Sequence, residues 1–349
     1  MEKNFTPLLI GSFPHRDCDR IGRLIAEHLR EYPMWPQLPN RSFHESMYVQ
    51  YSEGLPFVNI DMEERKIFFS DPESDPEALM EFMESAESGD LDRFAITRDF
   101  SEGLHDFASH PERLDKSRLQ AVKGHTTGPF SFALTVTDEN KRAAWFDPNL
   151  RETIRTGLRA KAVWQANFLK TLHDKAVLFI DEPYLAGIGS GVLSINKEEV
   201  RENIYSFIDE VKAAHPDLVT GIHCCGNTDW SIILDSPADI LSYDAYSYGS
   251  SLLVYRDKLR EFLGRGGCIA WGAVPTSDAA NSLGAEDVVS RLTPLFGELK
   301  RQGFRDDEIR DHSFISPACG TGSLSEETAE RILRLTCEVS AALRDRTTL

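Results

Sequence analysis

The sequence predicts an α/β protein folded as a closed (β/α)8 barrel, a TIM barrel, and three observations support this fold. From about Lys123 onward, short β-rich runs alternate with long amphipathic helical runs, which is the order of elements in parallel α/β folds. Together with the first 120 residues they make about eight strands, a number that favours a closed barrel over an open sheet. The chain of 349 residues contains no repeat, low-complexity run or linker that separates a second domain.

The regular part of the chain has six expected strands separated by helices. The strands cover 120–127, 176–181, 218–224, 240–244, 268–273 and 313–317. The helices carry apolar residues at spacings of three and four, which gives each of them one apolar face. They cover 151–173, 197–215, 252–266, 285–303 and 325–344. Ser325 followed by Glu327 indicates the start of the last helix, and Gly264 with Gly266 indicates the end of an earlier one.

The first 120 residues are less regular and elaborate the barrel. They contain a strand, a helix, a proline-rich stretch, a hairpin that is expected to supply one barrel strand, and a polar region of surface helices. These elements cover, in order, 8–13, 20–32, 34–43, 57–69 and 71–105. We therefore expect a single domain over residues 1–349, with an elaborated N-terminal region at about 33–118.

The composition argues against two classes of partner. The net charge of −18 and the lack of a basic run disfavour nucleic acid, because phosphate binding needs a local surplus of lysine and arginine. No stretch approaches the roughly 20 apolar residues of a membrane span, and the first residues do not resemble a signal peptide. Six cysteines, two of them adjacent, do not make a disulfide framework in so long a chain, so we expect a reducing cytoplasm.

The stretch GIHCCGNTDW, residues 221–230, contains the strongest candidate for a metal site. Side chains alternate along a strand, so His223 and Cys225 share one face while Cys224 points away. Cys319, in SPACGTG at the end of the last strand, supplies a second thiol at the rim where barrels keep their reactive groups. One imidazole and two thiolates suit Zn²⁺ and leave a fourth position for substrate. The alternative is that these cysteines are buried core thiols.

A zinc ion with two thiolate ligands favours one kind of chemistry. The thiolates place negative charge on the metal and weaken its power to activate water, so hydrolysis is not the obvious use. A substrate thiol in the open position is instead deprotonated at neutral pH and remains nucleophilic. The expected reaction is attack of the thiol sulfur on an electrophilic carbon, and a methyl group is the simplest such carbon.

Several motifs resemble those of known zinc methyltransferases. HCCGNTD, residues 223–229, resembles the HxCGNT element of zinc-dependent corrinoid:thiol methyltransferases in the uroporphyrinogen decarboxylase-like superfamily. Four further stretches resemble the C-terminal catalytic barrel of cobalamin-independent methionine synthase and occur in the same order. They are LLIGSFP (8–14), TGPFSF (127–132), FIDEPYL (179–185) and SPACG (316–320). The resemblance implies a barrel of this superfamily that methylates homocysteine or a related thiol, as in methionine biosynthesis.

The resemblance also implies a set of metal ligands. His223, Cys225 and Cys319 match the zinc ligands of the family. Asp244 stands where an acidic residue after the following strand often supplies a further ligand, although the methionine synthases have glutamate there. Asp244 is therefore expected either to bind zinc or to orient His223 from outside the coordination sphere.

A site for an amino-acid thiol is implied in the same way. Ile10, Gly11 and Ser12 match the element that holds the carboxylate of the amino acid through backbone and hydroxyl groups. Asp181 matches a carboxylate that binds the substrate ammonium, and the alternative is that this strand-end aspartate only stabilises a turn. Glu45 matches a second such acid, although its spacing differs from that of the family.

Departures from the methionine synthase pattern bear on the methyl donor. The chain shows no counterpart of the N-terminal barrel that helps to hold folate. A folate-contacting glutamate is replaced by small residues within 184–191, and a tryptophan is replaced near Leu134 and Thr135. The histidine proton donor expected after WGAVPTSD is missing. These differences favour a methylcorrinoid, free or on a carrier protein, over methyltetrahydrofolate as the donor.

Other uses of the same residues remain open. A decarboxylase of the porphyrinogen type needs an arginine-rich N-terminal element for propionates, and PHRDCDRIGR (14–23) has arginines without that pattern. A non-catalytic partner of a corrinoid protein, or a metal-binding scaffold, would retain the zinc site without turnover. Redox pairing of Cys224 with Cys225 is disfavoured because strand alternation points the two thiols apart.

Overall fold

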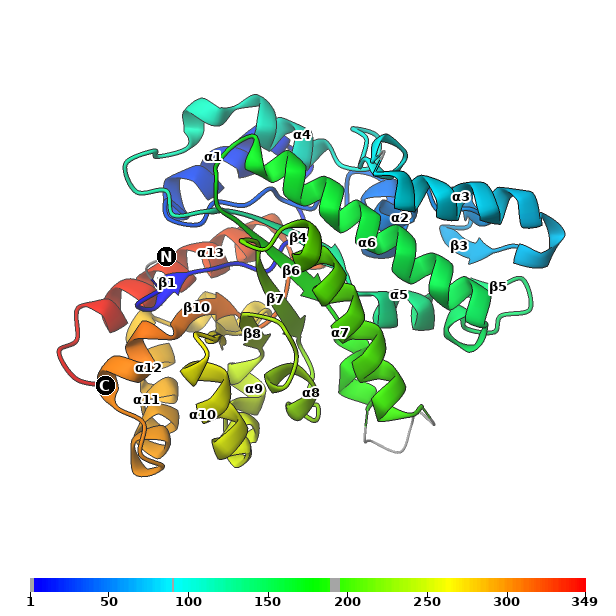
Figure 1. Ribbon diagram of the computed structural model, residues 1–349. Coiled ribbons are helices and arrows are strands. Elements are labelled where there is room, and N and C mark those ends of the chain that lie inside the picture. The colour runs from blue at the N-terminus through cyan, green and yellow to red at the C-terminus, as the bar shows by residue number, and fades with distance from the viewer. Residues whose placement is uncertain (1–2, 90, 189–194) are drawn as a thin grey trace.

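The computed structural model describes residues 3–89, 91–188 and 195–349 and has a curled parallel sheet at its centre (Figure 1). Seven strands of this sheet lie in the order β1-β10-β9-β8-β7-β6-β4, and every neighbouring pair is parallel. Their bounds are β1 Thr6–Pro7, β4 Val122–Thr127, β6 Ala176–Asp181, β7 Val219–Cys224, β8 Ile240–Tyr243, β9 Cys268–Val274 and β10 Ser313–Pro317.

An eighth extended segment, residues 33–37, closes the ring between the two edges of this sheet. On one side its Gln37 N–H donates to Gly11 O at 3.1 Å and its Gln37 O accepts from Phe13 N at 2.8 Å. On the other side Pro33 O accepts from Lys123 N at 2.9 Å. The predicted α/β barrel fold is therefore confirmed. The six strands expected after residue 120 all form within a few residues of their predicted bounds.

The hairpin at 57–69 forms as predicted, but the expectation that it supplies a barrel strand is wrong. β2 (Val58–Asp61) pairs antiparallel with β3 (Lys66–Phe69), and β3 pairs with β5 (Thr137–Asp138) in a separate three-stranded sheet. The barrel instead takes its remaining strand from the proline-rich stretch. Prolines at 33 and 36 lack backbone N–H groups, so this segment makes only isolated bridges and has the sequence pattern of a loop.

Helices surround the sheet, and most begin at a capping side chain. In α6 the carboxylate of Asp147 accepts from Asn149 N and Leu150 N, and in α13 the Ser325 hydroxyl accepts from Thr328 N, as predicted for that helix start. The bounds are α1 Cys18–His28, α2 Met47–Ser52, α3 Pro76–Ser88, α4 Glu102–Ser109, α5 Pro129–Thr135, α6 Pro148–Lys170, α7 Lys197–Ala214, α8 Ser231–Leu234, α9 Ala245–Tyr248, α10 Arg256–Gly264, α11 Ala285–Arg301, α12 Asp306–Asp311 and α13 Glu326–Arg344.

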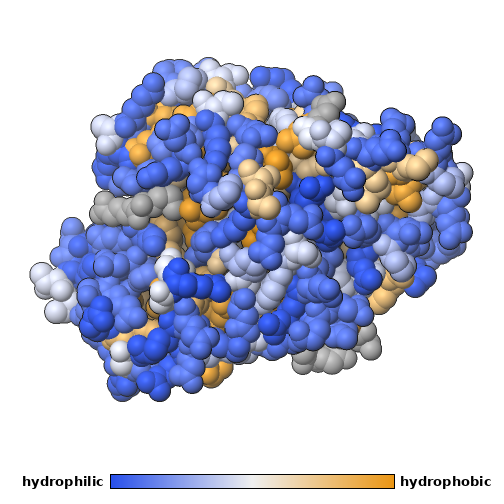
Figure 2. All heavy atoms as spheres, viewed as in Figure 1, coloured by the Kyte–Doolittle hydropathy of each residue, from blue (hydrophilic) through white to orange (hydrophobic). Residues whose placement is uncertain are grey.

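The apolar core has two main parts, one inside the barrel and one between the barrel and its helices. The interior part is a cluster of buried side chains, which are Leu8, Ile10, Tyr32, Ala121, Val177, Phe179, Ile240, Cys268, Ala270 and Phe314. The face seen in Figure 2 is mostly hydrophilic, with apolar side chains visible only in separate patches. In the described ranges, no helix combines the length and the apolar character that a membrane crossing requires.

Candidate metal centre and its cavity

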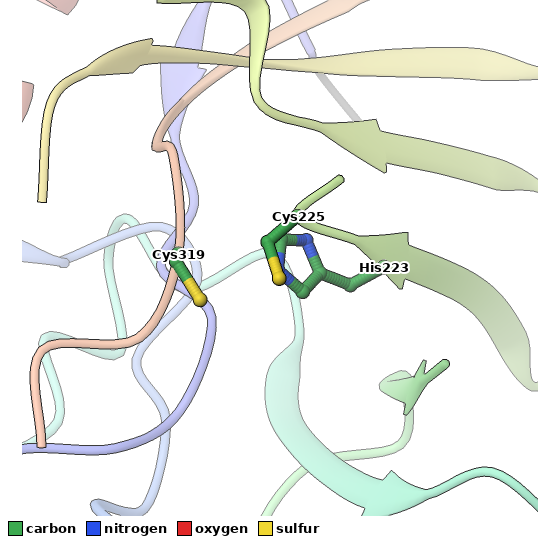
Figure 3. Close-up of side chains that lie close together, drawn as sticks. All are labelled: His223, Cys225 and Cys319. Atoms are coloured by element: carbon green, nitrogen blue, oxygen red, sulfur yellow. The ribbon is translucent and has the colours of Figure 1, made fainter. Parts of the chain in front are cut away.

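Three predicted ligands meet where the strands β7 and β10 end. His223 is the fifth residue of β7, Cys225 follows that strand directly, and Cys319 lies two residues after β10. One ligand atom from each of the three lies within 4.8 Å of the other two. Figure 3 shows the two sulfur atoms beside the His223 ring. The adjacent Cys224 is not part of this group, and its buried thiol donates to Gly226 O at 3.5 Å.

The donor set fits zinc. Around a tetrahedral zinc ion, sulfur and nitrogen ligands lie about 3.5–3.8 Å apart, so the observed group, with its atoms within 4.8 Å of one another, requires a shift of at most about 1.3 Å. His223 Nδ1 lies 3.0 Å from Ser242 Oγ, while its Nε2 is buried and has no hydrogen-bond partner among the described residues. Because one ring nitrogen is already held, the other is the one available to a metal.

The electrostatics of the two thiols also favour a cation. The neighbouring Cys319 thiol, and after it the His223 imidazole, lower the pKa of Cys225 to about 4. The same interaction with Cys225, together with burial, raises the pKa of Cys319. A cation between the two sulfur atoms would favour the thiolate form of both cysteines. Metal binding releases thiol protons, because zinc takes cysteine as thiolate.

Asp244 is placed differently from its predicted role. It does not belong to the group formed by the three other residues, and its carboxylate accepts from Ser247 N at 2.8 Å as the N-cap of α9. The residue that contacts the second nitrogen of His223 is Ser242, which lies opposite His223 in the register of β7 and β8. The structure thus gives the orienting contact to Ser242 and does not bring Asp244 to the ligands.

We expect Ser242→Ala to lower the zinc affinity about tenfold, because partners of a ligating histidine typically contribute 10- to 100-fold. Asp244→Ala is the matched variant and should leave the zinc affinity unchanged, while losing about 1 kcal/mol of stability with the helix cap. Competition with a chromophoric chelator measures the first quantity and urea unfolding the second. If only the Asp244 variant lost zinc affinity, Asp244 and not Ser242 would be the residue that supports the metal site.

A cavity of about 460 Å³ opens beside the three ligands. Its wall combines the metal group with residues of the N-terminal region and of the loop that follows β10. The lining residues are Ile10, Ser12, Gln37, Pro39, Asn40, Met47, Arg65, Asp181, Pro183, His223, Cys225, Cys319, Gly320, Gly322 and Ser323. A small organic molecule bound in this cavity would therefore lie next to the metal group.

Asp181 lies next to the metal group and provides a negative charge in the cavity wall. It ends β6 and pairs in register with His223 on β7. Its Oδ1 is buried without a hydrogen-bond partner among the described residues, which is unusual for a carboxylate that only stabilises a turn. Burial raises the pKa of Asp181 to about 6, while His223 and Lys123 act in the opposite direction.

Lys123 is a buried cation that sequence reasoning missed. It is 0% exposed, its Nζ donates to Ile10 O, and it lies 4.2 Å from the centre of the Phe179 ring. Burial lowers the pKa of this amine to about 7, and the nearby charge of Asp181 raises it. Lys123 thus ties β4 to the carbonyl of Ile10, the first residue of the predicted carboxylate-binding segment.

The segment Ile10–Ser12 is joined to the loop that carries Cys319. Ser12 O accepts hydrogen bonds from both Thr321 N and Thr321 Oγ1 at 2.9 Å, and Ser12 Oγ accepts from Gly322 N at 3.3 Å. A Cβ atom at Gly320 would lie 2.2 Å from Ser12 Oγ, so any other residue there would displace this hydroxyl from its present position. Ile10 and Ser12 line the cavity, whereas Gly11 does not and packs against the His125 ring.

The other predicted substrate-binding acid is not at the cavity wall. Glu45 is 2% exposed, and its Oε1 accepts from Arg41 Nε at 2.9 Å. Burial raises the pKa of Glu45 to about 7, and its Oε2 has no partner in the described part of the chain. Glu45 is absent from the lining residues, so its role toward a substrate stays a prediction. Residues 189–191 of the small-residue stretch 184–191 lie outside the described residues.

Comparisons with known proteins find similarity only at the level of solved structures. No protein-family model and no curated protein matches the chain. One similar solved structure is a B12-independent methionine synthase from Shewanella sp. W3-18-1 in complex with selenomethionine. The sequence identity is 17% and the TM-score 0.48, over 68% of this chain and 66% of that chain, slightly under two thirds of its length. The barrel assignment itself rests on the strand pairing within this chain.

Proposed function

We propose that this protein is a zinc-dependent S-methyltransferase that methylates homocysteine or a related amino-acid thiol. The observation that carries the proposal is the group of His223, Cys225 and Cys319, which offers two sulfur atoms and one nitrogen at the wall of an open cavity. When bound there, zinc lowers the pKa of a substrate thiol and leaves its sulfur nucleophilic. With no fourth ligand in the described group, one coordination position remains for that thiol.

The residues around the metal group provide contacts for an amino acid. The unpartnered Oδ1 of Asp181 is an acceptor for the substrate ammonium, and charge-assisted hydrogen bonds of this kind are the strong ones. The segment of Ile10 and Ser12 reaches the same cavity and is available to the carboxylate. The metal, Asp181 and the segment of Ile10 and Ser12 together hold the substrate at three points. This fixes the direction in which its sulfur faces the methyl donor.

The methyl donor that we propose is a methylcorrinoid, free or on a carrier protein. The sulfur lone pair forms the new S–C bond, the electron pair of the Co–C bond stays on cobalt, and the thiol proton leaves to solvent. Such a donor needs no protonation of its leaving group, which agrees with the missing histidine after WGAVPTSD. The sequence pattern alone supports the proposal of a methylcorrinoid donor and of a carrier protein.

The decarboxylase alternative lacks the cluster of arginines that it needs, because Arg65 is the only arginine among the described residues that line the cavity. It requires arginines for propionate groups, but Arg20 pairs with Glu326 and Glu330, and Arg23 pairs with Asp19. Neither arginine is among the residues that line the cavity. A non-catalytic scaffold would retain the metal without transferring a methyl group, so measured turnover decides between it and the proposed enzyme.

Metal analysis followed by zinc-edge X-ray absorption tests the proposal. We expect about one zinc per chain, and a further sulfur ligand after addition of L-homocysteine. L-Homoserine, which has a hydroxyl in place of the thiol, is the matched ligand and should add no sulfur. Zinc that keeps the same sulfur number with every thiol would contradict thiol activation. A protein without zinc would make the cysteines ordinary buried thiols.

A further inference from the structure

Arg65 is the only lysine or arginine among the described residues that line the cavity. It sits at the tip of the β2–β3 hairpin, between the paired residues Asp61 and Lys66, with a φ of 51°. The hairpin was expected to be part of the barrel, and its actual position in a separate sheet is what brings this arginine to the cavity. The side chain is exposed, whereas His223 at the inner end is 3% exposed.

The guanidinium of Arg65 is held in place but not neutralised. Its Cζ lies 5.0 Å from the centre of the Phe43 ring, a cation–π contact that limits its freedom. No ion pair joins Arg65 to a carboxylate in the described ranges, while the neighbouring Lys66 pairs with Glu64 at 3.2 Å. In a protein of net charge −18, an arginine without an acidic partner at the edge of a cavity is available to an anion from outside.

We infer that Arg65 binds an anionic group, a carboxylate or a phosphate, of the methyl donor and thereby determines donor specificity. The inference rests on the proposed function. The thiol occupies the inner end of the cavity, where the metal group, Asp181 and the Ile10–Ser12 segment lie. The outer end is left to the second substrate, whose methyl group must reach the sulfur. An anion on that substrate meets Arg65 first and is oriented by its planar guanidinium.

The test uses two corrinoids, of which only one carries a phosphodiester, and compares the effect of the Arg65 variant on each of them, because dicyanocobinamide lacks the entire nucleotide loop. Cyanocobalamin carries a phosphodiester, dicyanocobinamide lacks it, and neither has a methyl group to transfer. Their dissociation constants are measured by ultrafiltration on the zinc-loaded protein with L-homocysteine bound. Arg65→Gln should weaken cyanocobalamin binding about three- to tenfold, the range for one exposed ion pair with a hydrogen bond, and leave dicyanocobinamide binding unchanged. Added salt should weaken cyanocobalamin binding by the wild-type protein more than binding by the Arg65 variant.

Lys66→Gln is the matched control on the same hairpin and should change neither constant. A second arm compares L-homocysteine with 3-aminopropane-1-thiol, which is homocysteine without its carboxylate. If Arg65→Gln weakens only the binding of L-homocysteine, Arg65 binds the carboxylate of the thiol substrate. The assignment of Arg65 to the methyl donor is then overturned. It is also overturned if the variant changes nothing or if the wild-type protein does not bind cyanocobalamin. Failure of both thiols to reach the metal would instead contradict the proposed function.

Discussion

Cys225→Ser and Cys319→Ser are each expected to abolish stoichiometric zinc binding. Each substitution removes one of three protein ligands, and a neutral hydroxyl does not replace a thiolate in a site of this kind. The remaining imidazole and single thiolate do not retain the metal through gel filtration with a chelator. Metal analysis of the purified variants gives the result directly.

Cys224→Ala provides the matched control for these variants. Cys224 is adjacent to Cys225 in sequence, but it is fully buried and lies outside the ligand group. This variant should keep one zinc per chain, with a modest loss of stability from the smaller side chain. Full zinc content in both serine variants would contradict the proposed metal site. Loss of zinc from the Cys224 variant as well would indicate a general folding defect.

Asp181→Asn should weaken binding of L-homocysteine about 10- to 100-fold, because a charged hydrogen bond contributes about 1.5–3 kcal/mol. The amide has nearly the same shape as the carboxylate and keeps an oxygen acceptor, but it carries no charge to attract the substrate ammonium. The dissociation constant is measured by calorimetry on the zinc-loaded protein.

The control for Asp181 is the choice of thiol. 4-Mercaptobutanoate is homocysteine without its ammonium group, so Asp181→Asn should not weaken its binding. Zinc content serves as the second control, since Asp181 lies beside His223 without belonging to the ligand group. An unchanged constant for L-homocysteine would remove Asp181 from the ammonium site and leave it as a turn residue.

The three metal ligands could be predicted from the sequence because each prediction depends only on residues close to one another in the chain. His223 and Cys225 are two residues apart on a strand, and alternation alone places both on one face. Cys319 follows a second buried strand, and the carboxyl ends of parallel barrel strands share one rim. These two rules together were sufficient to predict that the three side chains meet.

The same rules could not predict that three further residues belong to the site, which are Ser242, Lys123 and Arg65. The contact of Ser242 with His223 depends on the register between β7 and β8, and no local pattern fixes a register between strands. In the sequence, Lys123 is an ordinary lysine within a strand, and only the structure shows that it is buried against Phe179. Arg65 lies far from all three ligands in sequence, and only the folding of the hairpin outside the barrel brings it to the cavity.

The sequence by itself determined the parallel barrel strands, their helices and the identity of the three candidate ligands, because periodicity and alternation are properties of neighbouring residues. The tertiary structure decided what those patterns leave free. It took the eighth strand from a proline-rich segment at 33–37, turned Asp244 to the cap of α9, and kept Glu45 away from the cavity wall. Each of these outcomes depends on packing and hydrogen bonds between residues distant in the chain, which compete with local preference and here outweigh it.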